Sequence, residues 1–171
     1  FYNKAYKILL CIYELNNSNK IDITNLEYIN TLIDKIINMA NPIDTSIKYY
    51  KITNAEENHH GFQYKDGLNI DTVPFNDNPR DRCCKGGLYF TTAEHLHKFL
   101  DYGINVREII LPLNDPDFKM VKNLKGDKFR ANKIILGWKK SIFDIDVIKE
   151  LKLYLYPDFV DYMSELGSYM T

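Results

Sequence analysis

The chain has 171 residues, of which 45% are hydrophobic and 26% are charged, and its net charge at pH 7 is −1. These values are typical of a folded domain with a core, and they argue against a disordered chain and against a general attraction to nucleic acid or anionic membranes. No apolar run approaches the ~20 residues of a membrane-spanning helix, and we recognise no signal peptide, so we expect a protein that is not secreted.

Residues 1–42 predict an N-terminal segment of two helices. Apolar residues recur at helical spacing up to the polar run at 16–19. Thr24 and Glu27 then form a capping box in front of a second apolar stripe, which Asn41 and Pro42 end.

Residues 43–142 predict an α+β core built on a small mixed or antiparallel sheet. Apolar and β-branched residues favour strands at 46–53, 88–90, 106–111 and 133–136. The polar segment 54–79 is expected to be a surface loop. Thr91 and Glu94 predict a second capping box for a central helix that ends at Gly103, and we expect Tyr89, just before it, to be mostly buried.

Residues 143–171 predict C-terminal helices, with Pro157 in the first turn of the last one. We expect the three segments to form one compact domain.

Histidines and cysteines gather in the middle of the chain and raise the question of a zinc site. His59-His60 and Cys83-Cys84 are adjacent pairs, and neighbouring residues of a strand point to opposite faces, so each pair chelates poorly. We therefore expect no bound metal. Three cysteines in total are an odd number, which favours a reducing compartment over a disulfide framework.

The segment 119–140 is locally basic, with lysines at regular intervals. Such a stripe could contact phosphates, but lysines also keep exposed sheet edges soluble. We expect the second role and no specific nucleic-acid binding.

Two motifs together resemble the ADP-ribosyltransferase superfamily. His60-Gly61 precedes Gly67-Leu68, and Gly87-Leu88-Tyr89-Phe90-Thr91 follows as a strand that enters a helix. The resemblance implies that His60 contacts the nicotinamide ribose of NAD and that Tyr89 stacks beside the nicotinamide. Glu108 is then the candidate for the glutamate that orients the ribose.

Longer strings resemble the amino-terminal region of giant-virus ankyrin-repeat proteins of the Mimivirus type. They are YKITNAEENHHGFQYKDGLN, CCKGGLYFTT, VREIILP and FRANKIIL. Abundant Lys, Ile, Asn and Tyr, which have AT-rich codons, fit that origin. The resemblance implies a module followed by ankyrin repeats, which are partner-binding surfaces. The apolar residues of the C-terminal helices, including Phe159, are then candidates to dock the first repeat.

We therefore expect a non-enzymatic interaction or capping module without a cofactor, in the host cytoplasm, the virus factory or the virion. Its expected partner is a protein that the sequence does not identify. The alternative is an ADP-ribosyltransferase-like enzyme that binds NAD, or a degenerate relative of one. The candidate functional surface comprises His59, His60, Phe62, Tyr64, Asn69 and Arg107.

Overall fold

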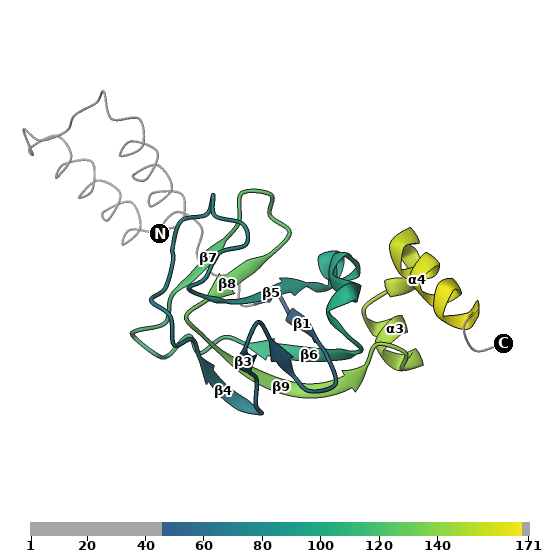
Figure 1. Cartoon of the computed structure of the whole chain (residues 1–171), viewed down its shortest axis with the longest axis horizontal. Helices are drawn as coiled ribbons and strands as arrows, with labels where there is room; N and C mark the ends of the chain where they lie inside the picture. Colours follow the sequence, from purple (N-terminus) through teal and green to yellow (C-terminus); the bar gives the residue numbers. More distant parts are fainter. Residues whose placement is uncertain (1–45, 169–171) are drawn as a thin grey trace, which may run out of the picture. The chain divides into compact units, whose positions relative to one another are not determined.

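The computed structural model describes residues 46–168, and these belong to one compact unit (Figure 1). The two predicted N-terminal helices lie outside the described residues. The main element is a seven-stranded sheet in the order β4-β9-β6-β1-β5-β8-β7, in which all neighbours are antiparallel. Its strands are β1 (Tyr49–Thr53), β4 (Gly67–Ile70), β5 (Leu88–Thr92), β6 (Asn105–Ile110), β7 (Met120–Lys122), β8 (Phe129–Ala131) and β9 (Lys133–Ser141). The predicted α+β class is confirmed.

Helices cover one face of the sheet. The 3₁₀ helix η1 (Ala93–Tyr102) follows β5, and α3 (Ile145–Glu150), η2 (Leu153–Leu155) and α4 (Pro157–Ser168) follow β9. Figure 1 shows α3 and α4 together at the end of the sheet away from β7 and β8. The predicted C-terminal helices, including Pro157 in a first turn, are confirmed.

The helix-side core is built on a cluster of apolar side chains. Tyr50 and Ile52 from β1 and Val106 from β6 meet Leu96 of η1 and Phe159 of α4. Tyr162 and Met163 pack against the same cluster. The C-terminal helix therefore buries Phe159 in its own domain, which corrects the expectation that this side chain docks an ankyrin repeat.

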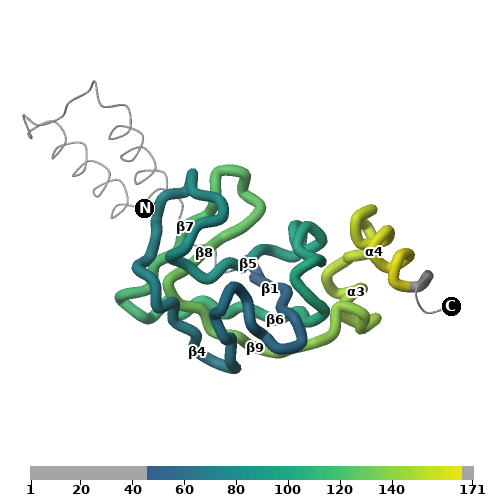
Figure 2. The backbone as a smooth tube through the Cα atoms, viewed as in Figure 1, coloured from purple at the N-terminus to yellow at the C-terminus, as the bar shows by residue number. Residues whose placement is uncertain are grey.

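A second core lies on the opposite face because neighbouring strand residues point to opposite sides. Tyr49 packs there with Tyr64, Phe90, Ile109 and other apolar residues. Over this face runs the segment from Asn54 to Pro79, which the tube in Figure 2 traces between β1 and β5. The expectation that it is a plain loop is wrong, because it contains β2 (Asn58–His59), β3 (Phe62–Gln63) and β4. Strands of two residues are too short to show a period of two in sequence.

The central helix forms where it is expected, but its predicted cap is wrong. Thr91 is a buried residue of β5, and its hydroxyl donates a hydrogen bond to the carbonyl oxygen of Asp127 at 2.6 Å. The N-cap residue is Thr92, whose side chain makes no capping hydrogen bond. Tyr89 is half-buried rather than mostly buried. Within residues 46–168, no helix has both the length and the apolar character that crossing a bilayer requires.

Candidate functional site

The central strands β1 and β5 separate after a short pairing. They are registered at Tyr49 with Thr92 and at Tyr50 with Thr91. On its other side β1 pairs with β6 from Tyr49 to Thr53. Beyond Tyr50 it no longer pairs with β5, whose residues Leu88 to Phe90 pair with β8 instead. The separation opens a cavity of about 570 Å³ that residues of both strands line. We call it the β1–β5 cleft, and its volume is in the range that holds a small organic ligand or a few peptide side chains.

The β2–β3 hairpin forms one wall of the cleft. His60 and Gly61 make its two-residue turn, and both have positive φ angles of 52° and 84°. Two-residue hairpin turns of the I′ kind require positive φ at both positions, which glycine adopts freely. Asn58 supports the turn by accepting a hydrogen bond from the Gly61 amide at 3.2 Å. The turn thus fixes His59, His60 and Phe62 along the cleft.

The histidine rings of this hairpin lie side by side. Their centroids are 4.2 Å apart and the planes are nearly parallel. The expectation that the two rings point to opposite faces is wrong, because the left-handed backbone at His60 breaks the alternation of the strand. His59 Nε2 is buried and has no hydrogen-bond partner in the described part of the chain. Burial, aided by the nearby charges of Lys51 and His60, lowers the pKa of His59 to about 4.

Lys51 crosses the floor of the cleft. Its side chain is buried, with 5% exposed, and its Nζ donates to the carbonyl oxygen of Tyr89 at 2.9 Å. The ammonium also lies 4.8 Å from the ring centroid of Tyr64. Burial lowers the pKa of Lys51 to about 8. Sequence reasoning did not single out Lys51; the one available signal is its position in a strand of otherwise apolar or small residues.

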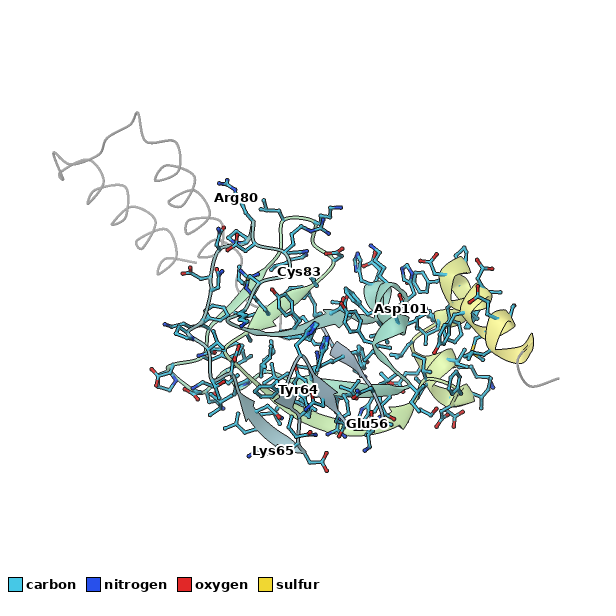
Figure 3. The ribbon with its side chains drawn as sticks, in the orientation of Figure 1. Glu56, Tyr64, Lys65, Arg80, Cys83 and Asp101 are labelled. Atoms are coloured by element: carbon cyan, nitrogen blue, oxygen red, sulfur yellow. The ribbon has the colours of Figure 1, made fainter. Side chains whose placement is uncertain are left out.

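Tyr89 and its neighbours form the opposite wall. The Tyr89 hydroxyl accepts from the Cys84 amide and donates to the Cys84 carbonyl, both at 3.1 Å. Lys128 Nζ lies 5.1 Å from the centroid of the Tyr89 ring and 3.2 Å from Cys83 Sγ. Figure 3 labels Cys83 and Tyr64, which come from the two walls of the cleft. Among residues 46–168, no three His, Cys, Asp or Glu side chains are placed to hold a metal ion.

Glu108 does not join His60 and Tyr89. The two latter residues both line the cleft, whereas Glu108 is absent from its lining. Glu108 pairs across the strands with Tyr50, and its carboxylate lies against Gly137 of β9. A bulge in β6 between Arg107 and Ile109 falls at this position. The cleft therefore has two of the three residues that the transferase resemblance implies.

Three residues of the predicted functional surface are buried: Tyr64, Asn69 and Arg107. Tyr64 lines the cleft, and burial raises its pKa, with Asp71 adding to the effect. Asn69 holds a turn, because its side-chain amide donates to the Lys65 carbonyl at 2.7 Å and its oxygen accepts from the Lys65 amide at 3.0 Å. Its role is structural.

Arg107 ties the segment before β4 to the sheet. Its Nε lies 3.3 Å from Glu57 Oε1, without the angle of a hydrogen bond, and its Nη2 donates to Asp66. This contact holds the pKa of the Asp66 carboxyl below its usual value. Glu57 also lies 3.7 Å from Lys139 Nζ. Arg107 is therefore a buried anchor of the cleft wall rather than part of its surface.

The basic segment 119–140 does not form one stripe. Lys133 Nζ donates to Asp115 at 2.7 Å, while Lys140 lies over the Trp138 ring. Arg130 is buried and donates to the carbonyl oxygens of Asn76 and Asn78. These basic side chains thus contact different partners instead of lining one surface. Lys122 lies on β7, at the edge of the sheet.

Curated relatives of the chain are found in Acanthamoeba polyphaga mimivirus. The chain is 54% identical over 96 residues to ankyrin repeat protein R868, covering 56% of this chain and 48% of R868. It is 50% identical over 101 residues to the uncharacterized protein R869, covering 59% of this chain and 72% of R869. With ankyrin repeat protein R896 it shares 44% identity over 116 residues, covering 68% of this chain and 34% of R896.

The chain thus spans about half of R868 and about a third of R896. No known family model matches it, and no solved structure matches it.

Proposed function

Because this chain belongs to the family that joins the mimivirus protein R869 with ankyrin repeat proteins of the same virus, we propose that it is a non-enzymatic protein-interaction module. In this proposal the β1–β5 cleft receives a segment of the partner protein. Ankyrin repeats present extended surfaces to partners, so a cleft in the accompanying module adds a second contact to the same partner. The proposal places the protein inside the infected cell, in the cytoplasm, the virus factory or the virion.

The composition of the cleft wall carries this proposal. Among residues 46–168, Asp71 is the single acidic residue of the lining. Both of its carboxylate oxygens accept backbone hydrogen bonds, from Gly87 at 2.6 Å and from Val73 at 3.0 Å. The other lining residues are aromatic, basic, small or apolar. Aromatic rings beside a few polar groups are typical of surfaces that bind a side chain of a partner.

Site-specific photocrosslinking from within the cleft tests the proposal. His60 is exposed and lines the cleft, so His60→p-benzoylphenylalanine places the reactive group at its mouth. Leu124, which is 64% exposed and outside the lining, is the matched control position. In infected host cells we expect a defined protein adduct from position 60, identified by mass spectrometry, and none from position 124. Equal adducts from both positions would contradict a role for the cleft.

The second candidate function is ADP-ribosyl transfer from NAD, favoured by the shared placement of His60 and Tyr89 in the cleft. Transfer requires a carboxylate that stabilises the positive charge developing during glycosidic cleavage. Glu108 lies outside the cleft lining, which favours the interaction module. Incubation of wild type, Tyr89→Ala and Glu108→Gln with labelled NAD and host lysate separates the two functions. Label transfer that both substitutions abolish would establish the enzyme.

A further inference from the structure

Four cationic side chains are buried among residues 46–168, and Lys51 is the exception among them. Arg107 meets the carboxylates of Glu57 and Asp66, and Lys133 meets Asp115. Arg130 donates to several backbone carbonyls. In this described part of the chain, the Lys51 ammonium contacts one carbonyl oxygen and one aromatic ring, and no carboxylate lies within ion-pair distance of it. A buried charge without an opposite charge is costly to the folded state.

The Lys51 ammonium retains capacity to bind. It carries three N–H donors, of which one is used by the Tyr89 carbonyl. The lysines Lys85 and Lys128, which line the same cleft, are also cationic. Asp71, the one acid that lines the cleft within the described part of the chain, is engaged by backbone amides. An anionic group entering the cleft would therefore supply the charge that Lys51 lacks.

The available donors favour a carboxylate over a phosphate. Phosphate sites usually rely on the planar fork of arginine or on a nest of backbone amides. The two buried arginines are already bound to protein groups, and the Gly87 amide donates to Asp71. One ammonium matches the single charge of a carboxylate. Beside it, Phe62, Tyr64 and Tyr102 offer aromatic walls for an apolar body.

We propose that the β1–β5 cleft binds a carboxylate attached to an apolar or aromatic body, with the carboxylate on Lys51 and the body against these rings. This inference extends the proposed function. It rests on that function for one point, namely that the carboxylate belongs to the partner protein. Its source is either the carboxyl terminus of a partner chain or an acidic side chain within it.

Calorimetry on the full chain with small probes tests the site itself. The probes are 3-phenylpropionate, its neutral amide and phenyl phosphate. We expect the carboxylate to bind at least tenfold more tightly than the amide or the phosphate. Lys51→Met should lose at least tenfold in affinity for 3-phenylpropionate. Lys140→Met is the matched control, because Lys140 also lies over an aromatic ring, at 5.1 Å from Trp138, but outside the cleft. It should stay within twofold of wild type.

The pH dependence gives a readout that needs no variant. The affinity for 3-phenylpropionate should fall above about pH 8, where the free protein loses the Lys51 proton. Equal binding of acid and amide, unchanged binding by Lys51→Met, or an affinity independent of pH up to 9.5 would each overturn the proposal.

Peptides distinguish the two sources of the carboxylate and separate this inference from the proposed function. A peptide ending in Phe with a free carboxyl terminus is compared with its amidated form and with an amidated peptide containing an internal Glu. Binding of the free acid alone assigns a chain terminus, and binding of the internal Glu peptide assigns a side chain. If 3-phenylpropionate binds through Lys51 but position 60 yields no protein adduct, the carboxylate site stands and the protein-partner function fails.

Discussion

The two faces of the central sheet bury very different residues. On the helix side, the buried cluster that includes Ile52, Leu96 and Val106 consists of apolar side chains. On the other side, the polar side chains of Lys51, Arg107 and Asn69 are buried in addition to the second apolar cluster. Since both faces belong to the same strands, chain connectivity does not explain the difference. We infer that the helix side stabilises the fold, and that the cleft side gives up part of that stability for recognition.

The largest expected effect breaks the helix-side core. Leu96 is fully buried there, so Leu96→Ala removes apolar contacts and leaves a cavity. We expect the free energy of unfolding to fall by about 3 kcal/mol, measured by urea denaturation. Leu124→Ala, at an exposed position, should change it by less than about 0.5 kcal/mol. The affinity for 3-phenylpropionate should stay unchanged in both. A similar loss in both variants would contradict the assignment of this core.

A change of opposite sign is expected on the cleft side. Lys51→Met removes a buried charge and keeps most of the apolar stem, so it should raise the free energy of unfolding at pH 7 by about 2 kcal/mol. Because the pKa of Lys51 is lowered to about 8, wild type gains stability as the pH rises from about 8 toward 10.5. The advantage of the variant should therefore shrink over that range. A destabilised Lys51→Met protein would show that the lysine serves the fold.

A smaller loss in the free energy of unfolding is expected at Thr91, where β5 contacts the loop before β8. Thr91→Val keeps the shape of the side chain but removes the hydrogen bond to the Asp127 carbonyl. We expect a loss of about 1 kcal/mol in the free energy of unfolding. Thr72→Val, at an exposed position, is the control and should be neutral. Equal denaturation midpoints for wild type and Thr91→Val would mean that this hydrogen bond contributes nothing.

The last effect is absent at neutral pH and appears only in acid. The pKa of His59 is lowered to about 4 by burial, so below its ordinary value near 6.5 the unfolded chain binds a proton that the folded chain refuses. Stability should therefore fall as the pH decreases from 6.5 to 4. In the His59→Gln variant, the midpoint of urea denaturation should depend less on pH over that range. The same slope in both proteins would show that other groups cause the acid sensitivity.

The sequence predicts the regular parts of this fold better than its site. The strand at 106–111 and the helices after residue 143 are recognisable because enough apolar residues repeat to show a period. The β2–β3 hairpin has no such repeat, although His60-Gly61 is a turn signal that could have indicated it. Thr91 was misread because the capping pattern and a strand end look alike in sequence.

The site itself depends on tertiary contacts that sequence does not show. His60, Phe62 and Tyr64 were predicted as a surface and do line the cleft. Lys51 was missed because a lysine in a short strand is read as exposed. Its burial depends on contacts that are distant in sequence, such as the hydrogen bond to the Tyr89 carbonyl, 38 residues further along the chain.

Strand β4 has a consequence for synthesis on the ribosome. Within residues 46–168 it has one neighbour in the sheet, β9, and Leu68 pairs with Ile135. The chain grows from the N-terminus, so β4 leaves the ribosome long before its partner exists. During that interval Leu68 and Ile70 belong to an unpaired strand, which is a template for association with other chains. The sheet cannot be completed cotranslationally until β9 emerges, so the edge of β4 stays unpaired in a nascent chain that stalls before Lys133.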